Sequence, residues 1–149
     1  MKSEGNPPRP VLGDSAAKLG VRDGQGGGTA DLAPDAGGKA VPGRGGMSVV
    51  SSLAGLAFRV ARGMFPPDLV PVRLNDSGQV PGASGRNTLH VFRIGGGEFE
   101  NALLNDELRL APDRDHHGTV QPAVVMAYGE YRQAIHRTRD DWESGEADR

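Results

Sequence analysis

The fold of this chain is decided by the stretch GTVQPAVVMAYGEYRQAIHRTRDDW, residues 118–142. Its first four residues predict a short strand over 118–121. Large apolar side chains then recur at helical spacing over about residues 127–142, with charged side chains on the opposite side. We expect this helix to pack its apolar stripe on a sheet. The stripe consists of Tyr128, Tyr131, Ile135 and Trp142.

Upstream of this stretch, several segments alternate in the manner of strands. Residues 88–94 form the clearest one, and shorter strands are expected over 70–74 and 108–110. Apolar residues between Ser48 and Met64 recur at helical spacing, so a helix is predicted there with Ser48 as a candidate cap. The predicted class is therefore α+β, with a small, mixed, mainly antiparallel sheet and an amphipathic carboxy-terminal helix.

The first 46 residues differ from the rest of the chain. They hold 12 of the 23 glycines, and no aromatic residue precedes Phe58. A segment of this composition has little apolar surface to offset the entropy lost on folding. We expect a disordered tail over 1–15 and either a linker or short docked strands over 16–46. A single compact domain over 47–143 and a tail over 144–149 complete the predicted organisation.

Composition also narrows the class of protein. A net charge of −2 disfavours a nucleic-acid binder, and the absence of cysteine excludes disulfides and thiolate nucleophiles. No apolar signal segment follows Met1, and no apolar run is long enough to cross a bilayer. We expect a cytoplasmic protein, or one exported without a cleaved signal peptide, that does not bind a membrane. The oligomeric state is left open.

Three segments in order resemble a family of small bacterial toxins. They are Gly45-Gly-Met-Ser-Val49, Pro66-Pro-Asp-Leu69 and His117-Gly-Thr-Val-Gln-Pro-Ala-Val-Val-Met126. The family is delivered by type VI secretion and has an ADP-ribosyltransferase-like fold. The resemblance spans about residues 43–142. It implies that NAD is the cofactor, that Ser48 and His117 bind NAD and take part in catalysis, and that a cognate immunity protein is a partner.

Each of these two residues also has a plain structural interpretation. Ser48 suits a helix cap or a strand end, and His117 suits a surface position beside Asp115. Met47 stands where the family has threonine. This departure favours an alternative function, a non-catalytic binding or accessory domain on a degenerate version of the same scaffold. An uncharacterised small α+β domain is a further alternative.

Other candidate residues come from local patterns. Glu98-Phe-Glu100 is similar to the paired glutamates of other ADP-ribosyltransferases, although a solvated loop is the favoured interpretation. Arg93 is a further candidate for cofactor binding. Acidic and histidine residues at 113–117 look like a metal cluster, but neighbouring histidines on a strand point apart, so no metal is expected.

Overall fold

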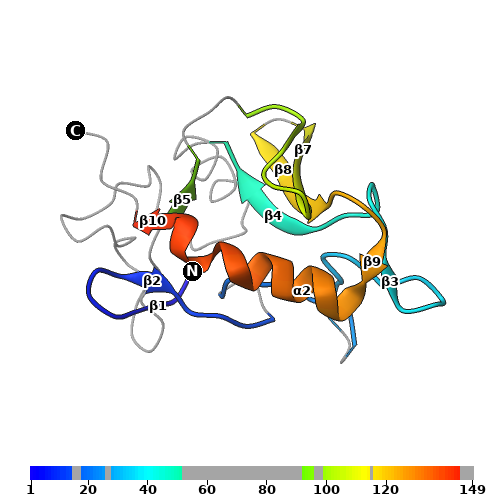
Figure 1. Ribbon diagram of the computed structural model, residues 1–149, viewed down its shortest axis with the longest axis horizontal. Coiled ribbons are helices and arrows are strands. Elements are labelled where there is room, and N and C mark those ends of the chain that lie inside the picture. Colours follow the sequence, from blue (N-terminus) through cyan, green and yellow to red (C-terminus); the bar gives the residue numbers. More distant parts are fainter. Residues whose placement is uncertain (15–17, 26–27, 52–91, 96–98, 115, 145–149) are drawn as a thin grey trace.

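The computed structural model of the chain describes residues 1–14, 18–25, 28–51, 92–95, 99–114 and 116–144. This part contains short antiparallel strand pairs and one α-helix, α2 (Figure 1). The predicted α+β class is confirmed. The elements are β1 (Ser3–Glu4), β2 (Arg9–Pro10), β3 (Lys39–Ala40), β4 (Met47–Val50), β5 (Phe92–Ile94), β6 (Ala102–Leu103), β7 (Leu108–Arg114), β8 (His117–Pro122), β9 (Met126–Ala127), α2 (Tyr128–Arg137), the 3-10 helix η3 (Thr138–Asp141) and β10 (Trp142–Ser144).

The largest sheet of the described residues has the strand order β4-β8-β7-β6. Within it, β8 lies between β4 and β7, with Met47 opposite Val120 and Leu108 opposite Pro122. Side chains alternate across a strand, so these four residues share one face of the sheet, and all are buried. The strands predicted over 108–110 and 118–121 are confirmed, and both are longer than expected.

Helix α2 packs on this buried face (Figure 1). Tyr131, Ala134 and Ile135 are buried on its inner side. The Tyr131 hydroxyl donates to the carbonyl oxygen of Val120 at 2.7 Å and accepts from the backbone N–H of Met47 at 3.2 Å. Because Met47 and Val120 are paired residues of β4 and β8, one hydroxyl ties the helix to both strands.

The predicted helix over 127–142 proves shorter. The α-helix ends at Arg137, η3 follows, and Trp142 starts β10. The Thr138 hydroxyl donates to the Ile135 carbonyl at 2.7 Å and accepts from Trp142 Nε1 at 2.9 Å. These bonds satisfy groups at the helix end and hold the indole against it. Trp142 is buried as expected, but through its pairing with β5 rather than on the helical stripe.

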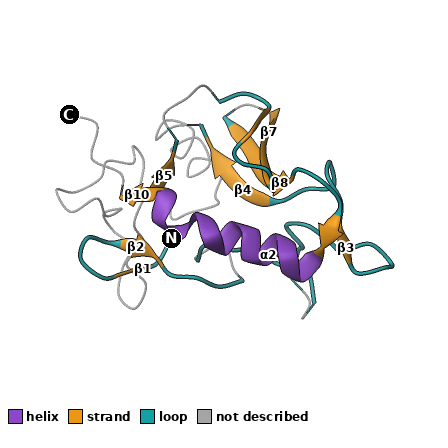
Figure 2. Cartoon of the chain, viewed as in Figure 1, coloured by secondary structure: helices purple, strands orange, loops and turns teal. Residues whose placement is uncertain are grey.

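Residues 1–14, part of the tail predicted over 1–15, include two paired strands and contacts with η3. β1 pairs with β2 (Figure 2). The Arg139 guanidinium donates to the Pro10 carbonyl at 3.0 Å and to the Glu4 carboxylate. Backbone pairing and ion pairs with η3 therefore hold a segment that lacks aromatic residues. The composition did not reveal these partners, because they come from the other end of the chain.

In the range predicted as a linker or short docked strands, 16–46, the described residues include one short strand, β3. β3 pairs with β9, and apolar side chains of this segment enter the same core as α2. The packed unit therefore includes residues before the predicted boundary at 47. The buried contributors are Leu19, Val21, Leu32 and Ala40.

The helix predicted over 48–64 is wrong at its start, because residues 47–50 form β4. Pairing with β8 along four residues outweighs the local helical spacing. Residues 52–64 and the predicted strand over 70–74 lie outside the described residues. The strand over 88–94 is confirmed for Phe92–Ile94 only. Within the described part, no helix has the length and apolar character needed to cross a membrane.

Candidate functional site

The face of the four-stranded sheet opposite α2 carries polar side chains. Ser48 on β4 is paired with Thr119 on β8, and Arg109 on β7 is paired with Gln121. His117 lies two residues before Thr119 and so points to the same side. We call these five residues the polar face. Cross-strand diagonal neighbours lie about 7–8 Å apart, so the structure brings Ser48 and His117 together.

The His117 imidazole is held in a fixed orientation. Its Nδ1 lies 2.5 Å from Asp113 Oδ1, and the side chain is 8% exposed whereas that of Asp113 is 45% exposed. An ionised carboxylate only accepts hydrogen bonds, so Nδ1 carries the proton and Nε2 is the nitrogen left for a ligand. The interpretation of His117 as a surface residue is wrong, because its ring is buried.

Ser48 is an exposed strand residue and not a helix cap. Beside it, a chain of hydrogen bonds crosses the polar face. The Gly43 N–H donates to Gln121 Oε1 at 2.5 Å, and Gln121 Nε2 donates to Thr119 Oγ1 at 3.3 Å. Since Thr119 accepts at its oxygen, its own hydroxyl proton is left to donate. Ser48 and Thr119 thus present two neighbouring hydroxyl groups.

Arg109 completes the polar face on β7. Its Nε atom is buried and has no hydrogen-bond partner among the described residues. Its two strand neighbours are Gln121, whose oxygen is engaged by Gly43, and Leu103, which is apolar. A guanidinium group has five N–H donors and no acceptor, so this position offers positive charge and donors together.

The structure does not bring the other predicted site residues to this pair. Arg93 lies in the separate β5–β10 sheet, where its guanidinium is 3.4 Å from the Glu143 carboxylate. Glu100 is exposed and precedes β6, two strands away from β8. Glu98 lies outside the described residues.

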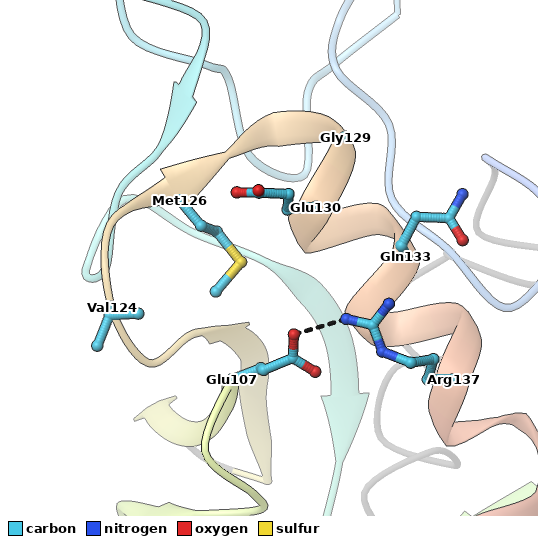
Figure 3. A pocket seen from close by; sticks show the side chains of 7 residues that line it. All are labelled: Glu107, Val124, Met126, Gly129, Glu130, Gln133 and Arg137. Atoms are coloured by element: carbon cyan, nitrogen blue, oxygen red, sulfur yellow. Dashed lines mark hydrogen bonds and ion pairs between the residues drawn. The ribbon is translucent and has the colours of Figure 1, made fainter.

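A separate groove runs along the outer side of α2. It has a volume of about 570 Å³, and Figure 3 shows Glu107 and Arg137 joined by their ion pair among its lining residues. Val124, which lines the groove, and its neighbour Val125 are 57% and 59% exposed. The Glu130 carboxylate accepts from the Ala127 N–H at 2.9 Å, which fixes the start of the helix. Neither Ser48 nor His117 lines this groove.

Described residues of the metal cluster considered around 113–117 contact other protein side chains. Asp113 contacts His117, and His116 Nδ1 lies 3.2 Å from the Ser51 hydroxyl. In the ranges that the structure describes, no group of three or more histidine, aspartate and glutamate side chains is placed to hold a metal ion.

No protein-family model, curated protein or solved structure matches this chain. The toxin-family resemblance therefore rests on the three sequence segments alone, and any function is argued from the site.

Sequence reasoning missed Arg109, Thr119 and Gln121 as members of the site. Their signal was present in the period of two, because polar residues occupy alternate positions 117, 119 and 121 of β8. Arg109 joins them only through the β7–β8 register, which the sequence alone does not specify.

Proposed function

We propose that this chain is a toxin-like domain related to NAD-dependent ADP-ribosyltransferases, with its site on the polar face. One observation carries the proposal. Ser48 and His117 come from distant parts of the sequence and were selected by the resemblance, and the β4–β8 pairing makes them diagonal neighbours on one face.

The residues fit the chemistry that such a transfer requires. The reaction breaks a ribose–nicotinamide bond through an oxocarbenium-like state, which nearby carboxylates and oriented donors stabilise. Asp113 supplies a carboxylate in direct contact with His117. The Ser48 hydroxyl is placed to bind ribose or nicotinamide, and His117 Nε2 is the ring nitrogen that a ligand meets. NAD would supply the ADP-ribosyl group, and a cognate immunity protein is the expected partner.

Growth of bacteria that express the chain in the cytosol tests this function. We expect wild type to stop growth and His117→Asn to relieve the arrest at equal protein levels. His136→Asn is the matched control, because His136 lies on α2 and contacts the Gly13 carbonyl rather than the polar face. If wild type is harmless in several hosts, the toxin function is wrong.

The groove along α2 favours a second candidate, a non-catalytic binding or accessory domain. This hollow of about 570 Å³ has the size of a ligand site, yet it lies apart from Ser48 and His117. Calorimetry with NAD separates the two functions. A transferase-like site predicts saturable binding that Ser48→Ala and His117→Asn both weaken. An accessory domain predicts no binding of NAD in any of the three proteins.

A further inference from the structure

Arg109 differs from most arginines of the described residues in having no carboxylate partner. Five arginines are held by an acidic side chain, whereas Arg44, Arg114 and Arg132 have no such ion pair among the described residues either, so the buried Nε is what sets Arg109 apart. The five pairs are Arg9 with Asp140, Arg22 with Asp31, Arg93 with Glu143, Arg137 with Glu107, and Arg139 with Glu4. No such ion pair is found for Arg109 in the described part of the chain, and its Nε is buried without a hydrogen bond.

An unpaired buried donor on a charged group is rare in folded proteins, because it has lost its water without gaining a partner. A structural arginine at this place would be expected to meet a carboxylate or a carbonyl. The directly opposite side chain on β8 is Gln121, whose oxygen accepts from the Gly43 N–H, and the buried Arg109 Nε does not donate to it. The Arg109 guanidinium therefore keeps a hydrogen-bond donor without a partner on the polar face.

Two more hydrogen-bond donors, the hydroxyls of Thr119 and Ser48, lie on the same face as Arg109. Thr119 is a diagonal neighbour of Arg109 across β7 and β8, and its hydroxyl accepts from Gln121, which leaves its proton to donate. Ser48 lies opposite Thr119 on β4. These three donors lie on the neighbouring strands β7, β8 and β4. The row that they form therefore extends about 10 Å.

We infer that Arg109 and Thr119 bind a phosphoryl group, and that the row of donors fits a diphosphate-bearing ligand. A row of donors about 10 Å long exceeds a single carboxylate and matches a chain of phosphoryl and sugar oxygens. Arginine contacts phosphate oxygens in a forked geometry, and hydroxyl donors complete the coordination. This inference deepens the proposed function and rests on it for the identity of the natural ligand, whereas the anion site itself rests on Arg109.

Calorimetric titration of the full chain with inorganic pyrophosphate and with ADP tests the site. We expect saturable binding that weakens at least about tenfold in Arg109→Gln, and that falls with added salt as ion-mediated binding does. Thr119→Val should weaken binding and Thr119→Ser should restore it. Arg137→Gln is the matched control, since it removes the same charge from α2.

A thermal melt distinguishes a binding role from a structural one. Arg109→Gln should leave the Tm unchanged or raise it, because it removes a buried donor that lacks a partner. A clear drop in Tm would mean that Arg109 holds the fold, and would overturn the inference. Equal weakening in Arg109→Gln and Arg137→Gln, or no pyrophosphate and ADP binding by wild type, would overturn it as well.

The same titrations separate this inference from the proposed function. If pyrophosphate and ADP bind through Arg109 but NAD does not bind, the anion site stands and the transferase proposal fails. If NAD binds and Arg109→Gln binds it as well as wild type does, the anion site is wrong and the proposed function stands.

Discussion

The two faces of the β4–β8–β7 sheet are built from alternate residues of the same strands, and they differ in almost every property. On the core face, Met47, Leu108 and Val120 are buried against Tyr131 of α2. On the polar face, Ser48 is exposed and Arg109 keeps an unpaired donor. The strand register determines which side chains pack in the core and which lie on the polar face, because a slip by one residue would exchange the two faces.

The largest effect should follow from emptying the core face. Tyr131→Ala should lower the free energy of unfolding by about 3–5 kcal/mol, as truncation of a buried aromatic residue does. Tyr131→Phe keeps the ring but leaves the Val120 carbonyl and the Met47 N–H without the hydroxyl. It should cost about 1–3 kcal/mol. Urea denaturation measures both values, and an unchanged free energy of unfolding in Tyr131→Phe would contradict the bridging role of the hydroxyl.

A smaller loss should follow where β4 begins. A Cβ added at Gly46 would lie 2.3 Å from the Val120 carbonyl oxygen and 3.0 Å from Gln121 Cα, so backbone must move. Gly46→Ala should therefore cost about 1–3 kcal/mol. Gly129→Ala is the control, because nothing lies within 4 Å of its added Cβ and alanine favours a helix. The idea of close strand contact fails if both variants behave alike.

Alkaline pH should lower the stability of the fold through Tyr128 and Tyr131, whose pKa values are raised. Burial, followed by the charge of Asp23, raises the pKa of Tyr128 to about 12, and burial raises the pKa of Tyr131 further. Unfolded tyrosine loses its proton near pH 10. Between pH 10 and 12 the folded chain therefore holds more protons than the unfolded chain, so stability falls as pH rises. Melting curves from pH 9 to 12 should show this fall, and Tyr131→Phe should reduce its slope.

The smallest effect on stability is expected on the polar face. Ser48 is exposed, and Ser48→Ala should change the free energy of unfolding by less than about 0.5 kcal/mol. Urea denaturation beside the Tyr131 variants measures the contrast directly. A loss as large as that of Tyr131→Phe would show that Ser48 supports the fold, and the distinction between the faces would then disappear.

The part of the fold that was predictable from sequence is the part with a strong period. The short strand predicted over 118–121 and the helical stripe of Tyr131 and Ile135 identified β8 and α2. The start of β4 was misread as a helix, since tertiary pairing overrides local spacing. The packing of residues 1–14 was also missed, because Arg139 and Asp140 hold them from far along the chain.

The candidate site was predictable only in pieces. The resemblance selected Ser48 and His117, and the structure places them on one face. It does not place Arg93 or Glu100 with them, because those residues belong to other strands or to the far edge of the sheet. Asp113 belongs to the site through its contact with His117 in the β7–β8 hairpin. Arg109 belongs to it through the β7–β8 register. Neither follows from the order of residues alone.

We propose that the polar face binds NAD. A titration of isotope-labelled protein with NAD, followed by NMR of the backbone amides, tests it most directly. The account predicts saturable shifts at Ser48, His117 and Thr119 that are lost in Ser48→Ala and His117→Asn. Shifts centred on Val124, Met126 and Gln133 in the α2 groove, or no shifts at all, would contradict it.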